Sequence, residues 1–193
     1  MISKDLLRHG RDVLNKLRTN KWERTDEGGI LVQGYGTIKG RYRDEGGEET
    51  NTLTYEGVNY VMMAGLKQGP QEAGFYLALF ANAYTPTRDL TAADFAVTAG
   101  EITSMTEGYA ETTRPAWVCS DADQAVMDNA DNLAEFSIVT DTELVVRGAA
   151  LLSDPVRGSS AGVLISAARY TNPRTLYGGQ PYRLEYETYI EPA

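Results

Sequence analysis

The strand-length segment PYRLEYETYI (181–190) constrains the fold of this chain most strongly. Apolar or aromatic residues alternate with mostly charged residues along it. Successive side chains of a β-strand point to opposite faces of a sheet, so one face should be buried and the other should contact water. The segment predicts an amphipathic strand whose core face carries Tyr182, Leu184, Tyr186, Thr188 and Ile190.

Much of the remaining chain has the pattern of short strands separated by turns. The acidic segment DEGGEETN (44–51) is predicted to be a loop. The succession of short strands predicts a mainly β fold, specifically an antiparallel β-sandwich or a jelly-roll-like body. The other predicted strands lie at 29–43, 74–82, 101–104, 114–119, 133–139, 142–152 and 161–169.

One short internal helix is predicted where hydrophobic residues recur with helical spacing. In YEGVNYVMMAGLKQG (55–69), Val58, Val61, Met62 and Leu66 keep this spacing, and the methionine pair is interpreted as core filler. Farther along, Thr91 is predicted to cap a single helical turn.

The first 24 residues differ from the rest of the chain in charge. They carry seven basic and three acidic side chains, a net charge of +4, whereas the remainder has a net charge of −13. We therefore predict a basic amphipathic helical arm (1–24) and a β-rich body (25–193). The arm could pack on its own body or dock on another subunit. The candidate partner-binding residues are Leu6, Arg8, Arg11, Val13, Leu14, Lys16, Leu17 and Arg18.

Composition narrows the possible environments and partners. A single cysteine, Cys119, excludes an intramolecular disulfide. The longest apolar run, YLALFA (76–81), is too short to cross a bilayer, and the N-terminus has no signal-peptide pattern. A net charge of −9 argues against binding nucleic acid, except through the arm.

The sequence offers no convincing catalytic or cofactor motif. The single histidine, His9, lies within the basic arm. The acidic segment 120–132 lacks the glycine and glutamate that an EF-hand loop requires at its sixth and twelfth positions, and GYGTIKG is not followed by a predicted helix. We expect a protein that is not an enzyme and has no cofactor or metal site.

Three segments, in order, resemble a family of small tailed-bacteriophage virion proteins. They are GFYLALFANAYTPTRDLTAADF, EITSMTEGYAETTRPAW and GVLISAARYTNPRTLYGGQPYRLEYETYI. The family has a WYLALF strand, a TP…LTAATF turn, a YTEATRPAW-like segment and a closing LSAARF…PRTV.NGDVL.VTYT. The resemblance covers about residues 55–190. This chain departs from it at Gly178-Gly179-Gln180, where the family has NGD.

The resemblance implies a non-enzymatic virion component, assembled in the host cytoplasm, with the major capsid protein or other virion proteins as partners. The expected role is capsid decoration (cement); the alternatives are a head–tail connector, tail or fibre component. The basic arm and the Gly-rich region 29–51 have no match in the family, and the charge and leucine pattern of the arm is what suggests that it anchors the chain to the shell. Virion symmetry favours a homo-oligomer, either a trimer or a ring. A carbohydrate-binding module using Tyr170, Tyr177 and Tyr189 is a further hypothesis, as is contact between the arm and DNA. No membrane partner is expected.

Overall fold

The structure, a computed structural model, describes residues 22–24, 30–32 and 37–191. The chain divides into two units, one formed by Gly40–Thr188 and the other by the residues on either side. In the smaller unit, β1 (Trp22–Arg24) pairs antiparallel with β2 (Ile30–Val32). The predicted helical arm lies outside the described residues except at its end. All of its candidate partner-binding residues are outside them: Leu6, Arg8, Arg11, Val13, Leu14, Lys16, Leu17 and Arg18.

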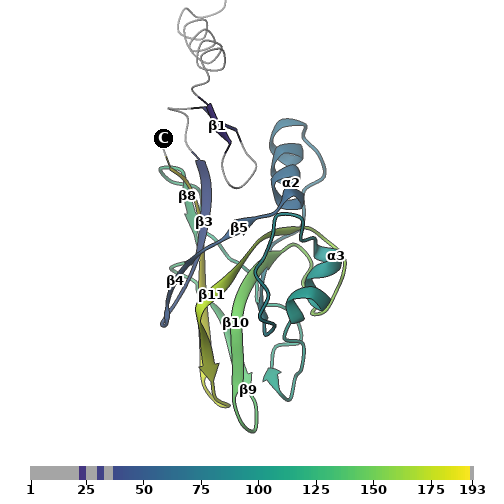
Figure 1. Cartoon of the computed structure of the whole chain (residues 1–193), viewed down its shortest axis with the longest axis vertical. Coiled ribbons are helices and arrows are strands. Elements are labelled where there is room, and N and C mark those ends of the chain that lie inside the picture. Colours follow the sequence, from purple (N-terminus) through teal and green to yellow (C-terminus); the bar gives the residue numbers. More distant parts are fainter. Residues whose placement is uncertain (1–21, 25–29, 33–36, 192–193) are drawn as a thin grey trace, which may run out of the picture. The chain divides into compact units, whose positions relative to one another are not determined.

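One sheet of the larger unit has four antiparallel strands (Figure 1). Its long central pair places Ala149 of one strand opposite Ala168 of the next, and the register shifts beside Leu152. The strands, in spatial order, are β5 (Thr52–Leu53), β11 (Leu164–Leu176), β10 (Leu144–Leu152) and β6 (Tyr76–Phe80).

The second sheet has six strands, one of them attached at the side of the main path. Its hairpin pairs Arg43 with Glu48 across two antiparallel strands. The main path runs through β4 (Gly47–Thr50), β3 (Thr37–Asp44), β12 (Pro181–Glu191), β9 (Ala134–Val139) and β7 (Gly108–Tyr109), and β8 (Val126–Asp128) pairs with β12.

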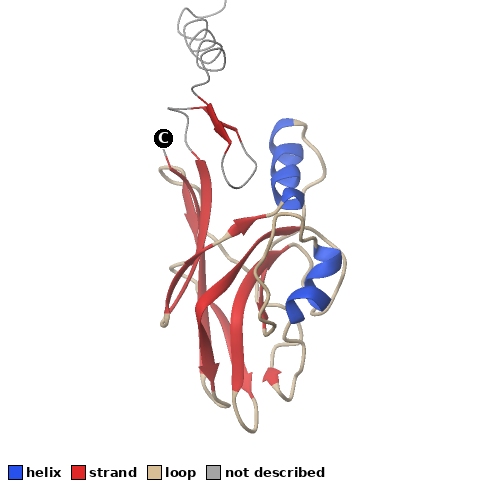
Figure 2. Cartoon of the chain, in the orientation of Figure 1, coloured by secondary structure: helices blue, strands red, loops and turns tan. Residues whose placement is uncertain are grey.

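Two hydrophobic clusters lie on opposite faces of the four-stranded sheet. Between the sheets, Leu77 and Leu79 of β6 pack with side chains such as Phe136 and Tyr186 of the six-stranded sheet. On the other face, Phe80 packs in a cluster that includes residues of α3 (Ala92–Phe95) and the π-helical turn η1 (Ala96–Gly100). Figure 2 shows these helices beside the strands. Both faces of β6 are buried, which explains its continuous apolar sequence.

The prediction of a mainly β chain with antiparallel sheets is confirmed. The helix predicted at 55–69 is α2 (Tyr55–Leu66), and the strands predicted at 133–139 and 142–152 are β9 and β10. The predicted loop at 44–51 is wrong, because β4 forms a hairpin with β3 there. Segments 101–104 and 114–119 contribute only isolated bridges, at Glu101 and Ala116. Thr91 does precede α3, but its hydroxyl donates to the Asp94 carboxylate instead of capping the backbone.

The amphipathic prediction for the last strand is only half correct. Tyr182, Leu184 and Tyr186 are buried in the core as expected, whereas Ile190, predicted for the same face, is 50% exposed. On the opposite side, however, Glu185 and Glu187 are also buried, because arginines of β3 cover them. This face is charged yet largely shielded from water.

Candidate functional site: an exposed apolar helix

Helix α2 presents its large hydrophobic side chains to solvent. Six of them are exposed, from 39% for Val58 to 82% for Leu66. The body instead contacts the side of the helix that carries Gly57, Tyr60 and Ala64, which are buried or half-buried. The six exposed side chains are Tyr55, Val58, Val61, Met62, Met63 and Leu66. The interpretation of Met62 and Met63 as core filler is therefore wrong.

A glycine on the inner side of α2 determines how closely the helix packs against the body. A Cβ atom at Gly57 would lie 2.5 Å from the carbonyl oxygen of Ile165 in β11. No side chain fits there without a shift of the backbone, so the glycine allows close contact between helix and strand. Next to it, Tyr60 stacks edge-on against Phe75, with ring centroids 5.8 Å apart.

Polar contacts fix the first turn of α2. The Thr54 hydroxyl accepts a hydrogen bond from the backbone N–H of Gly57 at 3.0 Å and donates to the carbonyl of Leu164. The Glu56 carboxylate accepts from the N–H groups of Ala92 and Leu164, both at 2.8 Å. The helix is thus tied at its N-terminus to β11 and α3, while the C-terminal turns extend away from these contacts.

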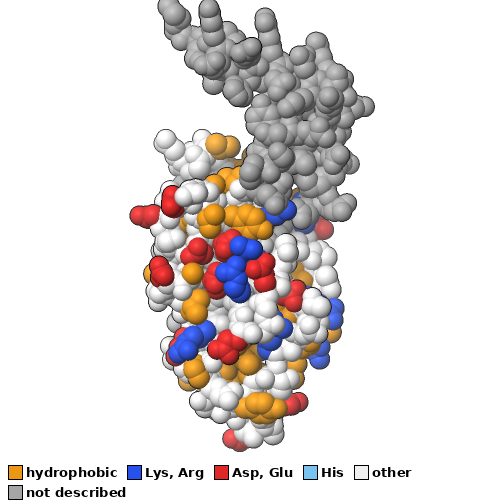
Figure 3. All heavy atoms as spheres, turned by 90° about the vertical axis from the view of Figure 1, so that its left-hand side faces the viewer, with side chains coloured by type: hydrophobic (Ala, Val, Ile, Leu, Met, Phe, Trp, Pro, Cys, Tyr) orange, Lys and Arg blue, Asp and Glu red, His pale blue; other side chains and the backbone are white. Residues whose placement is uncertain are grey.

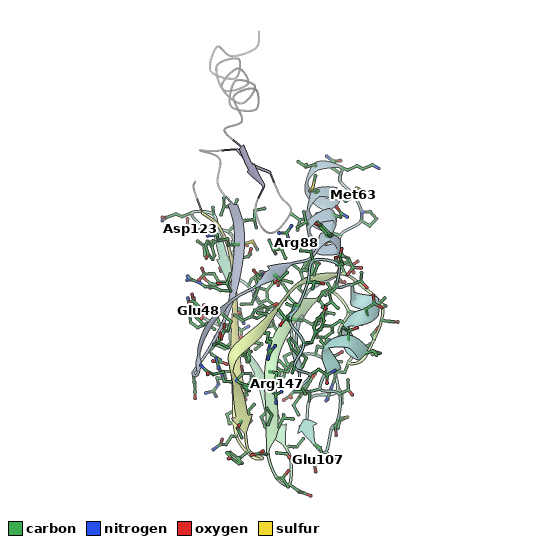
Figure 4. The ribbon with its side chains drawn as sticks, viewed as in Figure 1. Glu48, Met63, Arg88, Glu107, Asp123 and Arg147 are labelled. Atoms are coloured by element: carbon green, nitrogen blue, oxygen red, sulfur yellow. The ribbon has the colours of Figure 1, made fainter. Side chains whose placement is uncertain are left out.

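The exposed face of α2 is also uncharged. From Gly57 to Leu66 the sequence contains no Asp, Glu, Lys, Arg or His. Described cations lie only at the two ends of the helix: Lys67 follows Leu66 as the C-cap residue, and the Arg88 guanidinium lies 5.5 Å from the ring centroid of Tyr55. Figure 4 labels Met63 on this helix and Arg88 near its base. An exposed, uncharged cluster of large apolar side chains is typical of an interaction surface.

The outer face of the six-stranded sheet is charged, but its charges pair with one another (Figure 3). Arg41 contacts Glu187 at 2.7 Å and Glu48 at 3.1 Å. Arg43 contacts Glu185 at 2.5 Å and also reaches Glu48 at 3.1 Å. These contacts hold β3, β4 and β12 together, so we interpret the cluster as structural.

A buried ion pair organises the loops at the edge of the core. Arg114 forms two hydrogen bonds of 2.7 Å with the Glu101 carboxylate, and both side chains are fully buried. Arg114 also donates to the carbonyl of Asp154 at 2.7 Å, and Glu101 accepts from the N–H of Gly158 at 3.0 Å. Arg114 belongs to TRPAW, one of the segments that carry the family resemblance, and its role here is to connect loops.

Of the tyrosines proposed for carbohydrate binding, one is enclosed in the core of the body. Tyr170 is buried, and its hydroxyl contacts that of Tyr182 at 2.9 Å. Tyr182 in turn donates to Asp44, which pairs with Arg174 at 2.9 Å. Of the named set, Tyr177 is exposed, and Tyr189 belongs to the other unit. The hypothesis of a Tyr170–Tyr177–Tyr189 site is therefore wrong for Tyr170.

The other residues considered for chemistry show no assembled site. Cys119 is half-buried, and burial raises the pKa of its thiol, which disfavours a reactive thiolate. Among the described residues, no group of three His, Cys, Asp or Glu side chains is placed to hold a metal ion. In that same part of the chain, no helix is long and apolar enough to span a membrane. His9 lies outside the described residues.

Comparison with models of known protein families and with curated proteins yields no match for this chain.

Proposed function

We propose that this chain is a non-enzymatic structural component of a tailed-bacteriophage virion, in the role of a capsid decoration (cement) protein. Its partners are the major capsid protein or other virion proteins. We further propose that its body is a β-sandwich and that residues 1–24 anchor it to the shell.

The exposed apolar face of α2 is the observation that carries this proposal. A chain that functions alone in water gains nothing from exposing Met62, Met63 and Leu66 on one uncharged helix. A component of an assembly, in contrast, buries such a face against a neighbour. The charges of the buried pair Glu101–Arg114 and those around Glu48 pair with one another. This arrangement suits a rigid body that occupies a fixed position in an assembly.

The resemblance to virion proteins supports the proposal that this assembly is a tailed-bacteriophage virion. Two arginines in its motifs, Arg114 and Arg174, make ion pairs inside the body, with Glu101 and Asp44 respectively. Both contacts connect separate segments of the body, as residues with a structural role do.

The arm is proposed to supply the contact with the shell. An exposed ion pair contributes only about 0–1 kcal/mol, whereas burial of one leucine contributes about 1.5–3 kcal/mol. The stripe formed by Leu6, Val13, Leu14 and Leu17 would therefore provide most of the affinity, and the basic residues would provide orientation. Several copies bound together would raise the effective affinity.

Co-sedimentation of the full chain with capsid shells of its own virus tests the anchor. The variant Arg11→Gln/Lys16→Gln/Arg18→Gln should bind less at moderate salt, and Leu14→Asp/Leu17→Asp should not bind. A matched control, Lys67→Gln/Arg169→Gln/Arg183→Gln, removes three exposed bases from the body and should bind normally. Full binding by the Leu14→Asp/Leu17→Asp variant would refute the anchor.

Reconstruction of the intact particle distinguishes decoration from a tail role. Hundreds of copies distributed over the shell would support a decoration protein. A dozen copies or fewer, confined to the portal or the tail, would contradict it and favour the connector.

A further inference from the structure

The width of the exposed arc on α2 indicates how many neighbours it contacts. An α-helix turns by about 100° per residue, so the positions from Val61 through Met62 to Met63 bracket an arc of about 200°. All residues on this arc are exposed, and the residues outside it, such as Gly57 and Tyr60, are buried or half-buried. The arc contains all six exposed apolar side chains, together with Asn59 and Gly65.

One neighbouring helix is too narrow to cover this arc. A helix packed against a single surface typically buries an apolar stripe about 100° wide. A twofold dimer through α2 would therefore leave either Val61 or Met63 in water. Two neighbouring helices, one against each flank, would cover the whole arc.

The charge of the chain favours further copies of itself as those neighbours. Each copy carries a net charge of −9, so copies repel one another over most of their surfaces. The segment from Gly57 to Leu66 has no charged side chain. On this surface, identical acidic chains can therefore approach one another without placing like charges together.

We propose that α2 packs against the α2 helices of two other copies in a closed cyclic oligomer, with a trimer as the smallest ring. Rotation about one axis keeps the helices parallel and brings the Val61 flank of each copy against the Met63 flank of the next. Closure of the ring leaves no open apolar flank. This inference concerns the free protein and does not depend on attachment to a capsid.

Charge substitutions on the two flanks test this arrangement in the full chain. Val61→Glu alone and Met63→Lys alone should each lower the native mass from at least three times 21.2 kDa to that of one chain. The double variant Val61→Glu/Met63→Lys should restore the larger mass, because each junction then pairs a glutamate with a lysine. Circular dichroism should be unchanged throughout, because both positions are exposed.

The matched control carries the same charges elsewhere on the body. Val97 and Met105 are exposed at 85% and 51%, so Val97→Glu/Met105→Lys should keep the mass of the unaltered chain. Native mass spectrometry or sedimentation equilibrium provides the readout.

Four outcomes would overturn the proposal. They are a monomeric or dimeric unaltered chain, a mass that grows with concentration without limit, no recovery in the double variant, and dissociation by Leu14→Asp/Leu17→Asp. The last would identify the arm as the occupant of the α2 face. The mass is measured without capsids, so a result against the oligomer can be distinguished from a result against the capsid anchor.

Discussion

At the scale of single residues, the polar groups of the body act mainly to hold loops and strands together. Arg114 and Glu101 are fully buried and satisfy each other, whereas Arg183 and Glu135 form an ion pair that remains 51% and 48% exposed. Both contacts join arginine to glutamate at a short distance. The two ion pairs differ in burial, and burial therefore determines how much stability is lost when either pair is broken.

Arg114→Met should destabilise the body by about 3–5 kcal/mol, because it leaves Glu101 as an unpaired buried charge. Arg183→Met, its exposed counterpart, should change stability by about 0–1 kcal/mol. Urea denaturation followed by tryptophan fluorescence measures both. Similar losses in the two variants would show that burial does not govern these pairs.

The two glycines of α2 provide a second contrast between neighbouring residues. A Cβ at Gly57 would approach the Ile165 backbone to 2.5 Å, whereas a Cβ at Gly65 meets nothing within 4 Å. Gly65→Ala should therefore stabilise the helix by about 1 kcal/mol. Gly57→Ala should instead cost about 1–3 kcal/mol, as core overpacking does. Thermal unfolding measures both, and a stabilising Gly57→Ala would contradict the close contact between α2 and β11.

At the scale of elements, sequence patterns predict the longer strands but not the shorter ones: segments 101–104 and 114–119 contribute only isolated bridges. Segments such as 133–139 and 181–190 alternate clearly, and a period of two identifies a strand with one core face. Segment 44–51 is predicted to be a loop because it holds four acids and two glycines. Its Glu48 instead pairs with Arg41 and Arg43 of the neighbouring strand, and a sequence does not reveal partners across strands.

The direction in which α2 faces could not be predicted from periodicity. The same spacing of Val58, Met62 and Leu66 arises whether a helix faces its own core or a neighbouring chain. One signal was available: the segment from Gly57 to Leu66 has no charged residue for a solvent-facing side. The predicted arm residues, including Leu14 and Leu17, stay a prediction because they lie outside the described part of the chain.

At the scale of the whole molecule, buried tyrosines should limit stability at high pH. Five of the twelve tyrosines are buried in the core between the sheets. Burial raises the pKa of Tyr42 well above its usual value, and it raises the pKa of Tyr186 to about 12. The five are Tyr42, Tyr109, Tyr170, Tyr182 and Tyr186.

These raised pKa values determine whether the stability of the folded chain rises or falls with pH. The unfolded chain loses its phenolic protons near pH 10, before the folded chain does. Stability should therefore be full below about pH 10 and fall as the pH rises toward 12, with Tyr186 alone accounting for about 2–3 kcal/mol. Tyrosinate absorbance should rise cooperatively with unfolding. Independent titration of all tyrosines near pH 10 in a folded protein would disagree with this account.

In the proposed oligomer, other copies of the chain cover the outer face of α2. Methionine oxidation tests it directly, because Met62, Met63 and Met105 are exposed to similar extents in a single chain, at 53%, 45% and 51%. Limited treatment of the native full chain with peroxide, read by peptide mass spectrometry, compares their rates. We predict that Met62 and Met63 are oxidised several-fold more slowly than Met105 at high protein concentration, and that dilution removes the difference. Equal oxidation rates of the three methionines at every concentration would contradict this oligomer.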